Sequence, residues 1–347
     1  MLGRIIRAQE RRMATRDTNR VVRPFEWGTH FVSPGANGED PREFFRRHTD
    51  EVLRRSENFF ALPHVTDYKL DGDLLTWTSA VETPTPENNT ARARLFPAAV
   101  KEARRGEASS RPRRAVLVIP QWNAEAHGHV NLCRALARLG VASLRLTLPY
   151  HEERRPAELE RADYLVSSNV GRTLQSVRQA VLDARAAARW LKSEGYERLG
   201  IVGTSIGSCV AFLALTHDAS INVGVFNHVS GYVADVVWRG ISTRHVREGF
   251  GDALTLEELR RHWLPISPLA FAARLLDDSP PRPLRFIAAR HDLTFPPDLS
   301  REMIDEMRRL GVAVDAAWLP CGHYTAGELP WVYLDGWKIV SFLRKHL

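Results

Sequence analysis

A serine in a glycine-rich turn is the first residue whose setting suggests chemistry. The segment Gly203-Thr204-Ser205-Ile206-Gly207 lies between an apolar run that predicts a buried strand and one that predicts a helix. On such a turn the serine hydroxyl projects above the sheet edge, while the two glycines let strand and helix approach closely. The amide of Ile206 begins the helix and can donate to a developing oxyanion. The pattern predicts a nucleophile; a glycine-rich turn that binds phosphate, or nothing, is the alternative.

A serine hydroxyl is a weak nucleophile unless a base and an orienting acid accompany it. Asp292 directly follows the predicted strand 284–289, and prolines come after it in the same loop. His323 directly follows the predicted strand 313–319. Because the carboxyl ends of parallel strands share one edge of a sheet, we expect these two residues to meet Ser205 there. We predict a catalytic triad in which His323 is the base and Asp292 orients it.

Other residues could fill the same roles. Asp235 is the alternative acid, since it follows the preceding strand. Asp292 could be only a turn or capping carboxylate, although Asp298 is better placed to cap the next helix. His323 could be a surface histidine, and His291 adjoins the acid but is out of chain order.

Alternating strands and helices are expected to position these residues. The predicted strands of this region lie at 115–119, 142–148, 198–204, 221–226, 284–289 and 313–319. The predicted helices lie at 130–139, 172–194, 206–216, 299–310 and 332–343. Such alternation implies crossover connections, so the predicted fold class is α/β, a mostly parallel sheet flanked by helices. The segments before it predict a helix at 41–56, strands at 74–81 and 91–96, and an exposed loop at 101–114.

Composition excludes several classes of protein. The chain has 347 residues, of which 44% are hydrophobic and 26% charged, values typical of a globular protein. Three scattered cysteines fit neither a disulfide framework nor a zinc site, and they favour a reducing, cytoplasmic location. No apolar run is long enough to span a membrane, and the N-terminus lacks the apolar core of a secretory signal.

Arginine accounts for nearly all of the net charge of +7, since only five of the 48 basic residues are lysines. An anionic partner would suit that charge, but the arginines are spread out without an aromatic stripe, so we predict a solvated surface and no nucleic-acid partner. Residues 1–24 carry seven arginines. We expect a frayed tail there; the alternatives are a basic arm in contact with an anionic membrane surface and an organelle-targeting leader.

From about Arg114 to the C-terminus the sequence resembles the α/β-hydrolase superfamily. The resemblance rests on the GTSIG turn, on the strand that runs into Asp292, and on the strand that runs into Cys321-Gly322-His323. The segments PQWNAEAHGH, LPYHEERRP and NVGRTLQSVRQAVLDARAAARWL are similar to the subgroup around the human α/β-hydrolase-domain protein eighteen. The resemblance implies a serine carboxylic-ester hydrolase that needs no metal or other cofactor.

The sequence departs from many lipases and esterases after the first core strand. Pro120-Gln121-Trp122-Asn123 occupies the place of their HGGG motif. The resemblance therefore implies that the amide of Gln121 or Trp122 is the second oxyanion donor, with Ile206 the first. Trp122 could instead be an aromatic pocket wall or a core residue.

Several loop residues are candidates for substrate binding. His151 and Arg154, with His127 and His129, could bind a polar or anionic head group, or they could be solvated loop residues. The histidines lack the spacing and the carboxylate partner of a metal site, so no metal is predicted. Trp238 is a further candidate for contact with substrate.

An irregular stretch at 232–283 interrupts the alternation where superfamily members often carry a lid. Its apolar side chains could line a hydrophobic substrate pocket or simply pack the cap onto the core. The predicted organisation is an N-terminal arm and helix at 1–60, a hydrolase core at 61–231 plus 284–347, and an inserted helical cap at 232–283.

Ester hydrolysis through an acyl-enzyme is the function that these residues favour. The basic surface and the apolar cap favour a lipid-like or long-acyl ester. Contact with a membrane surface through the basic N-terminus is the alternative to a frayed tail. An acyltransferase or a peptidase would use the same triad. The alternative from another class is a non-catalytic binding module on a hydrolase scaffold.

Overall fold

The structure is a computed structural model that describes residues 2–33, 35, 38–99 and 112–347. Most of the loop expected at 101–114 lies outside the described residues. Within them, the strands are β1 (Lys69–Asp71), β2 (Leu74–Thr78), β3 (Thr90–Phe96), β4 (Arg114–Ile119), β5 (Ala142–Thr147), β6 (Arg198–Thr204), β7 (Ile221–Asn227), β8 (Leu284–Ala289) and β9 (Asp315–Leu319).

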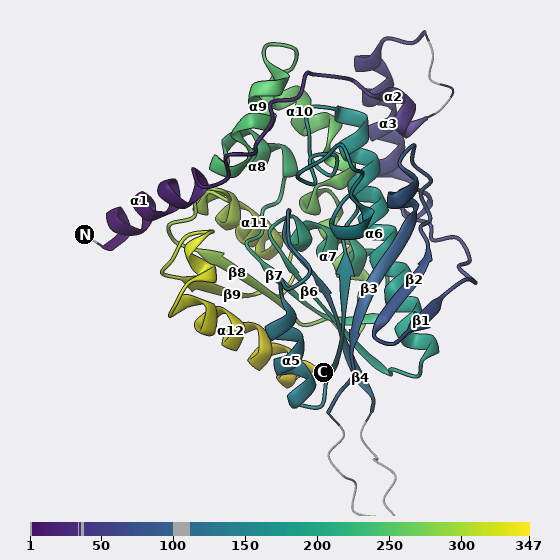
Figure 1. Ribbon diagram of the computed structural model, residues 1–347, viewed down its shortest axis with the longest axis vertical. Helices are drawn as coiled ribbons and strands as arrows, with labels where there is room; N and C mark the ends of the chain where they lie inside the picture. The colour runs from purple at the N-terminus through teal and green to yellow at the C-terminus, as the bar shows by residue number, and fades with distance from the viewer. Residues whose placement is uncertain (1, 34, 36–37, 100–111) are drawn as a thin grey trace, which may run out of the picture.

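These strands form one sheet in the order β1-β2-β3-β5-β4-β6-β7-β8-β9 (Figure 1). The strands from β5 to β9 pair in parallel, as the alternation predicts. β1, β2 and β3 pair antiparallel, and β3 is also antiparallel to β5. The carboxyl ends of β6, β7, β8 and β9 therefore share one edge of the sheet, where the candidate site residues follow.

The helices are α1 (Leu2–Ala14), α2 (Thr29–Val32), α3 (Pro41–Arg54), α4 (Ser56–Phe59), α5 (Val130–Arg138), α6 (Val170–Ser193), α7 (Ile206–Thr216), α8 (Val233–Arg239), α9 (Arg244–Phe250), α10 (Leu256–His262), α11 (Pro297–Arg309) and α12 (Trp331–His346). The sequence did not predict α2, α4 or β1, which are four residues long or shorter. Such short segments have too little hydrophobic periodicity to be recognised.

Side chains alternate along the strands and pack into two hydrophobic cores, one on each face of the sheet. Leu117 and Ile119 of β4 pack in a core with α6 and α7, whereas Val116 and Val118 pack with α5 and α12. Figure 1 shows α5 and α12 on one side of the sheet and α6 and α7 on the other. The fold is thus a mostly parallel sheet between two layers of helices.

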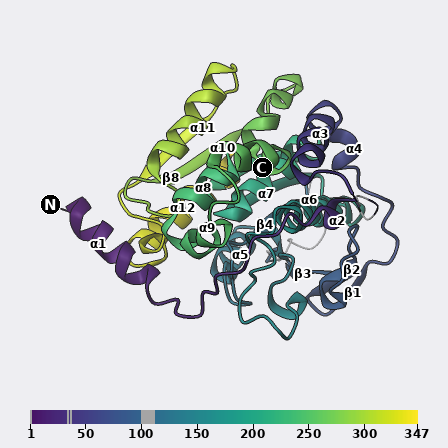
Figure 2. The same ribbon diagram turned by 90° about the horizontal axis from the view of Figure 1, so that it is seen from above.

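The stretch predicted as a cap is helical. It contains α8, α9 and α10, followed by a 3-10 segment at Pro268–Asp277. These three helices lie at the top of Figure 1, and in Figure 2, which is seen from above, they face the viewer. Phe250 and Trp263 are fully buried, and Trp263 Nε1 donates to the Val170 carbonyl at the start of α6. The aromatic side chains of this region therefore anchor it to the core.

The N-terminal segment is not a frayed tail. α1 buries Ile6, Glu10 and Ala14, which recur every four residues on one helical face, against the body of the protein. Leu2 and Ile5 in its first turns are exposed. Figure 1 shows the N-terminal end of α1 projecting from the molecule.

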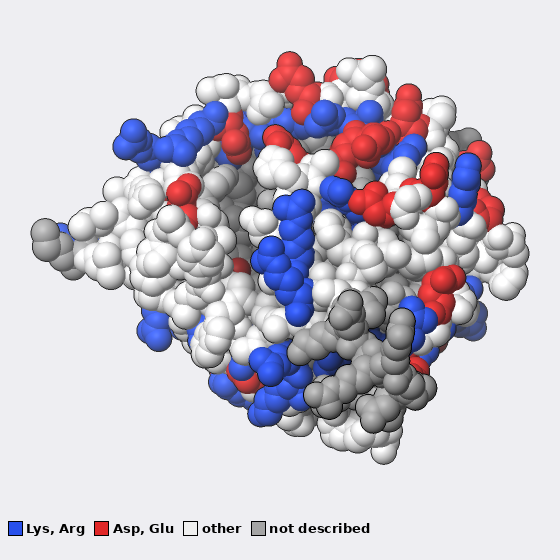
Figure 3. Space-filling view, turned by 60° about the horizontal axis from the view of Figure 1, so that its bottom comes forward, with Lys and Arg blue, Asp and Glu red and all other residues white. Residues whose placement is uncertain are grey.

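Many arginines pair with nearby carboxylates at the surface. Examples are Arg42 with Glu258 at 3.1 Å and Arg285 with Asp315 at 2.6 Å. On the face shown in Figure 3, basic and acidic side chains are interspersed with uncharged surface. Within the described residues, no helix is both long and apolar enough to cross a bilayer.

The turn between β6 and α7 requires glycine at two positions. A Cβ on Gly203 would lie 2.0 Å from the Gly207 carbonyl oxygen, and a Cβ on Gly207 would lie 2.3 Å from the Pro120 carbonyl oxygen. Neither separation is possible for non-bonded atoms, so the spacing of the two glycines is what lets β6, α7 and the end of β4 meet.

We predict that Gly207→Ala destabilises the protein by about 1–3 kcal/mol or more, because the new methyl group must displace backbone atoms. Urea unfolding followed by circular dichroism measures the change. The matched control is Gly336→Ala in α12, where a Cβ meets no atom within 4 Å. That control is expected to unfold at the same urea concentration as the wild type or at a slightly higher one. Equal effects of the two changes would contradict the packing argument.

Candidate active site

Ser205 lies on the strained turn that its motif predicts. Its backbone has φ 58° and ψ −126°, which is uncommon for a residue with a Cβ. Its amide donates to the Asn227 carbonyl at 2.8 Å, and Ser208 Oγ donates to the Ser205 carbonyl at 2.7 Å. These bonds tie the turn to β7 and α7. Ser205 lines a cavity of about 1770 Å³ at the carboxyl edge of the sheet.

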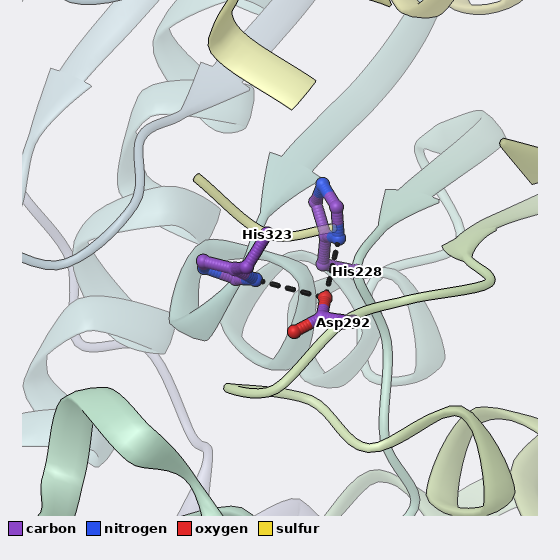
Figure 4. Close-up of side chains that lie close together, drawn as sticks. All are labelled: His228, Asp292 and His323. Carbon is purple, nitrogen blue, oxygen red and sulfur yellow. Dashed lines mark hydrogen bonds and ion pairs between the residues drawn. The ribbon is translucent and has the colours of Figure 1, made fainter. Parts of the chain in front are cut away.

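Asp292 and His323 meet in the loops that follow β8 and β9. The Nδ1 atom of His323 lies 3.0 Å from Asp292 Oδ2 (Figure 4). The other oxygen, Oδ1, accepts from the amides of Thr294 and Phe295, at 2.7 Å each. The Phe295 ring stacks on the His323 ring with an interplanar angle of 2°. Asp292 is therefore both the turn carboxylate of its own loop and the partner of the imidazole.

His323 and Ser205 line the same cavity. Within the described residues, no hydrogen bond joins the Ser205 hydroxyl to the His323 ring, and contacts of this kind are often long in the absence of substrate. The structure thus brings the candidate acid and base into direct contact and places the candidate nucleophile on the same cavity.

Asp292 also binds a second imidazole, which the sequence did not single out. His228 Nδ1 lies 2.9 Å from the same Oδ2 atom, and both side chains are almost wholly buried. Burial by itself would raise the pKa of Asp292, but the charge of His323 and the hydrogen bonds from the two imidazoles hold that pKa well below its usual range. The carboxyl group is therefore ionised at neutral pH.

The loop after β4 is fixed from several sides. The Asn123 amide donates to His151 Nε2 at 2.8 Å, and the Ala162 amide donates to Asn123 Oδ1 at 2.8 Å. Trp122 Nε1 donates to the Ala162 carbonyl at 2.9 Å. Within the described residues, the amides of Gln121 and Trp122 donate to no other backbone group. Both remain candidates for the second oxyanion donor, beside the Ile206 amide at the start of α7.

The structure places the three residues expected to contact substrate in different settings. His151 lines the cavity, but its Nδ1 lies 2.9 Å from the Pro149 carbonyl and its Nε2 accepts from Asn123, so it holds the loop. Burial lowers the pKa of His151 to about 4, which keeps the ring neutral.

Arg154 is fully buried, and its guanidinium binds Asp183 and the carbonyls of Asn88 and Thr147 rather than the cavity. Trp238 does not line the described cavity either, because its ring packs against Phe250 and Arg247.

The alternative acids and base are engaged elsewhere. Asp235 is buried and binds Arg260 Nε at 2.8 Å. Asp298, which the sequence offered as a helix cap, does not cap α11. It lies in the first turn of that helix and pairs with Arg239 at 2.7 Å. His291 packs against α1, where a Cβ on Gly3 would lie 2.6 Å from its ring. Of the acids considered, Asp292 is the one in contact with the imidazole of His323.

Among the described residues, His228, Asp292 and His323 lie close enough together to hold a metal ion. However, a metal ligand must present a lone pair to the ion, and both imidazoles direct Nδ1 at the Asp292 carboxylate. The trio is thus a hydrogen-bonded acid–base cluster. The sequence also offered His127 and His129 for binding a head group. The His129 ring lies 3.0 Å from Thr204 Oγ1, and His127 is exposed beside Glu125.

α1 holds the loop that carries His323. The carboxylate of Glu10 is completely buried and accepts from the amides of Tyr324 at 3.1 Å and Thr325 at 2.8 Å. It packs so closely that a Cβ on Gly322 would lie 2.3 Å from its carboxyl carbon. The signal in the sequence was the position of Glu10 on the helical face of Ile6, but that signal is weak without knowledge of its partners.

Solved structures of other proteins share the fold of this chain. The crystal structure of an acylaminoacyl peptidase from Pyrococcus horikoshii superposes with a TM-score of 0.59 and 15% identity, over 84% of this chain and 43% of that one. A puromycin-hydrolysing peptidase from Mycobacterium tuberculosis gives a TM-score of 0.58 and 16% identity, over 83% of this chain and 48% of that one. A lipase in its open form gives a TM-score of 0.54 and 12% identity, over 78% of this chain and 97% of that one. The chain has the α/β-hydrolase fold.

The sequence match is narrower than the structural one. Residues 125–238 match the family "Alpha/beta hydrolase domain containing 18", a range that includes Ser205 and His228 but neither Asp292 nor His323. No curated protein matches the chain significantly by sequence. The chain spans less than half the length of the two peptidases.

We predict that Glu10→Ala slows the chemistry of Ser205 although Glu10 lies outside the cavity lining. Two amides next to His323 lose a charged acceptor, so the protein should lose about 2 kcal/mol of stability and label with a fluorophosphonate about tenfold more slowly. Glu10→Gln keeps one side-chain oxygen as an acceptor, so its stability and labelling rate should lie between those of the wild type and Glu10→Ala. The control is Arg11→Ala, an exposed neighbour on the same helix. Labelling at the wild-type rate in Glu10→Ala would show that α1 does not position the loop.

Proposed function

We propose that the protein is a serine hydrolase that cleaves a carboxylic ester through an acyl-enzyme. The observation that carries the proposal is the hydrogen bond from His323 to a buried, ionised Asp292, on the same cavity as a serine held in a strained strand-to-helix turn. A buried carboxylate bound to one ring nitrogen orients the imidazole, whose other nitrogen can then accept a proton.

In the proposed reaction, Ser205 Oγ attacks the carbonyl carbon of the ester while His323 Nε2 takes its proton. The oxygen of the tetrahedral intermediate accepts hydrogen bonds from the Ile206 amide and from the amide of Gln121 or Trp122. Collapse of the intermediate expels the alcohol, which leaves with the proton held by His323. Water then attacks the acyl-enzyme, with His323 again taking and returning the proton, and Asp292 stays ionised throughout.

The shape of the site supports an ester with a sizeable apolar part. An apolar pocket of about 40 Å³ adjoins Ser205, lined by side chains such as Val233 and Phe295, and it holds only a small group. The main cavity continues along α5 and α12, where Tyr333 and Trp337 line it and are largely exposed. A lipid-like or long-acyl chain would therefore lie in the main cavity.

The N-terminal helix would suit contact with an anionic membrane surface. Its outer side carries the exposed side chains of Leu2 and Ile5, and arginines lie between and beyond them. Apolar side chains next to basic ones are the pattern of helices that lie in the interface of a membrane.

A peptidase is the second candidate, because two of the structures that superpose are peptidases. The same triad and oxyanion donors would attack an amide carbonyl, so the choice depends on the groups that the cavity accepts. Comparing p-nitrophenyl esters with the p-nitroanilides of blocked and free aminoacyl groups separates the two functions.

We predict that a fluorophosphonate probe labels the wild type and not Ser205→Ala, since the probe reacts only with an activated serine hydroxyl. Asp292→Asn should lower the labelling rate by about a hundredfold or more, because the His323 imidazolium loses its charge partner. Intact-mass measurement of the labelled protein gives the site occupancy. An unlabelled wild type would favour a binding module on a hydrolase scaffold.

We also predict that hydrolysis of p-nitrophenyl esters is fastest for chains of intermediate or long length. The rates for acetate through palmitate are compared as kcat/KM, with Ser205→Ala as the blank. Each methylene that the cavity buries should contribute up to about 0.8 kcal/mol to transition-state binding. A maximum at acetate would contradict a lipid-like substrate and leave the ester hydrolysis itself intact.

A further inference from the structure

His228 contacts the candidate acid as closely as the candidate base does. The two Nδ1 atoms lie 2.9 Å and 3.0 Å from the same oxygen of Asp292, and the centroids of the two rings are 4.6 Å apart. With Thr294 and Phe295 bound to the other oxygen, four donors surround this carboxylate. A carboxylate has about four acceptor positions, so Asp292 is saturated.

The backbone of His228 is fixed as firmly as its side chain. It has a φ of 54°, and its amide donates to the Ile287 carbonyl at 2.8 Å. Its carbonyl accepts from Ser208 Oγ at 3.2 Å, and the same hydroxyl binds the Ser205 carbonyl. A strained residue that the surrounding structure holds in place is typical of functional sites. His228 is thereby tied to the serine turn on one side and to the acid on the other.

The charges around His228 come from four elements. Asp292 follows β8, His323 follows β9, Asp335 lies on α12, and Glu10 lies on α1. Burial opposes protonation of His228, but the hydrogen bond to Asp292 and the charges of the three carboxylates raise its pKa above the usual value. Burial raises the pKa of Asp335, an effect that the charge of His228 opposes. Figure 4 shows the second nitrogen of His228 directed away from Asp292.

We propose that His228 is a positioning residue for the base: it shares one oxygen of Asp292 with His323 and thereby sets the pH range in which His323 can accept a proton. This inference rests on the proposed function. Two imidazoles on one carboxylate titrate as a coupled pair, so a proton on one disfavours a proton on the other. When His228 holds the proton, the negative charge of Asp292 is already compensated by a cation at 2.9 Å.

The pH profile of His228→Gln tests this coupling. Glutamine can still donate one hydrogen bond to Asp292 but carries no proton that titrates. We expect the acid limb of kcat/KM for p-nitrophenyl acetate to move to higher pH by roughly half to one unit, because a positive charge about 5 Å from His323 has been removed. Above that limb, the activity should stay within about tenfold of the wild type.

His48→Gln is the matched control, because His48 is a partly buried histidine that lines a separate pocket, away from Asp292. Its acid limb should coincide with that of the wild type. If His228→Gln loses activity equally at all pH values, or keeps the wild-type limb, the inference is wrong. Failure of the proposed function is a distinct result, since the wild type would then not react with a fluorophosphonate at any pH.

A measurement on the wild type keeps the inference testable if His228→Gln does not fold. Nitrogen-15 NMR of the imidazole groups follows the protonation of each histidine, with the His228 and His323 signals assigned by their loss in single variants. We expect the two rings to take up protons in two coupled steps, with His228 protonated first. Independent titration of the two rings, or protonation of His323 first, would overturn the inference.

Discussion

A carboxylate that is almost removed from water must be matched by hydrogen-bond donors, and the arrangement of the site follows from how Asp292 meets this requirement. Two donors come from its own loop, and the other two come from the loops after β7 and β9. Three separate loops are thereby fixed on one group. The loss of any donor would leave a buried negative charge under-compensated, which is costly in a medium of low dielectric constant.

The same requirement explains why parts of the chain far from the cavity contribute to the site. Glu10 of α1 is itself a buried carboxylate, and it is matched by the amides that follow His323. Arg145 is buried beneath the loop after β4 and donates to the carbonyls of Glu125 and Gly128. Each of these buried groups finds its hydrogen-bond partners in the backbone of a loop. The same hydrogen bonds that compensate its burial therefore also fix the position of that loop.

Two of the residues that the sequence offered for substrate contact bind the protein backbone. Arg154 and His151 lie close behind the carboxyl edge of the sheet, where a side chain can reach backbone groups more readily than it can reach a ligand. The cavity is lined by His151 together with side chains of α5 and α12 and the loops around them, whereas Arg154 does not reach it. A polar residue near an active site thus serves the scaffold whenever the neighbouring loops leave carbonyl or amide groups unpaired.

The sequence by itself determined the longer elements and the glycine-rich turn that carries Ser205. The apolar runs of β4, β6 and β8 and the long apolar stripe of α6 are local patterns, and the spacing of Gly203 and Gly207 records a steric need of one turn. Chain order and strand ends were also sufficient to select Asp292 and His323 as the candidates for acid and base.

Only the tertiary structure decided which groups share Asp292 and which helix supports the loop of His323. The contacts of His228 with Asp292 and of Glu10 with Thr325 join residues 64 and 315 positions apart, and no local pattern encodes such pairs. Each side chain has an ordinary neighbourhood in the sequence and gains its role from charge compensation between loops. That compensation exists only after the sheet has brought the loops to one edge, which is the physical reason that the sequence could not reveal it.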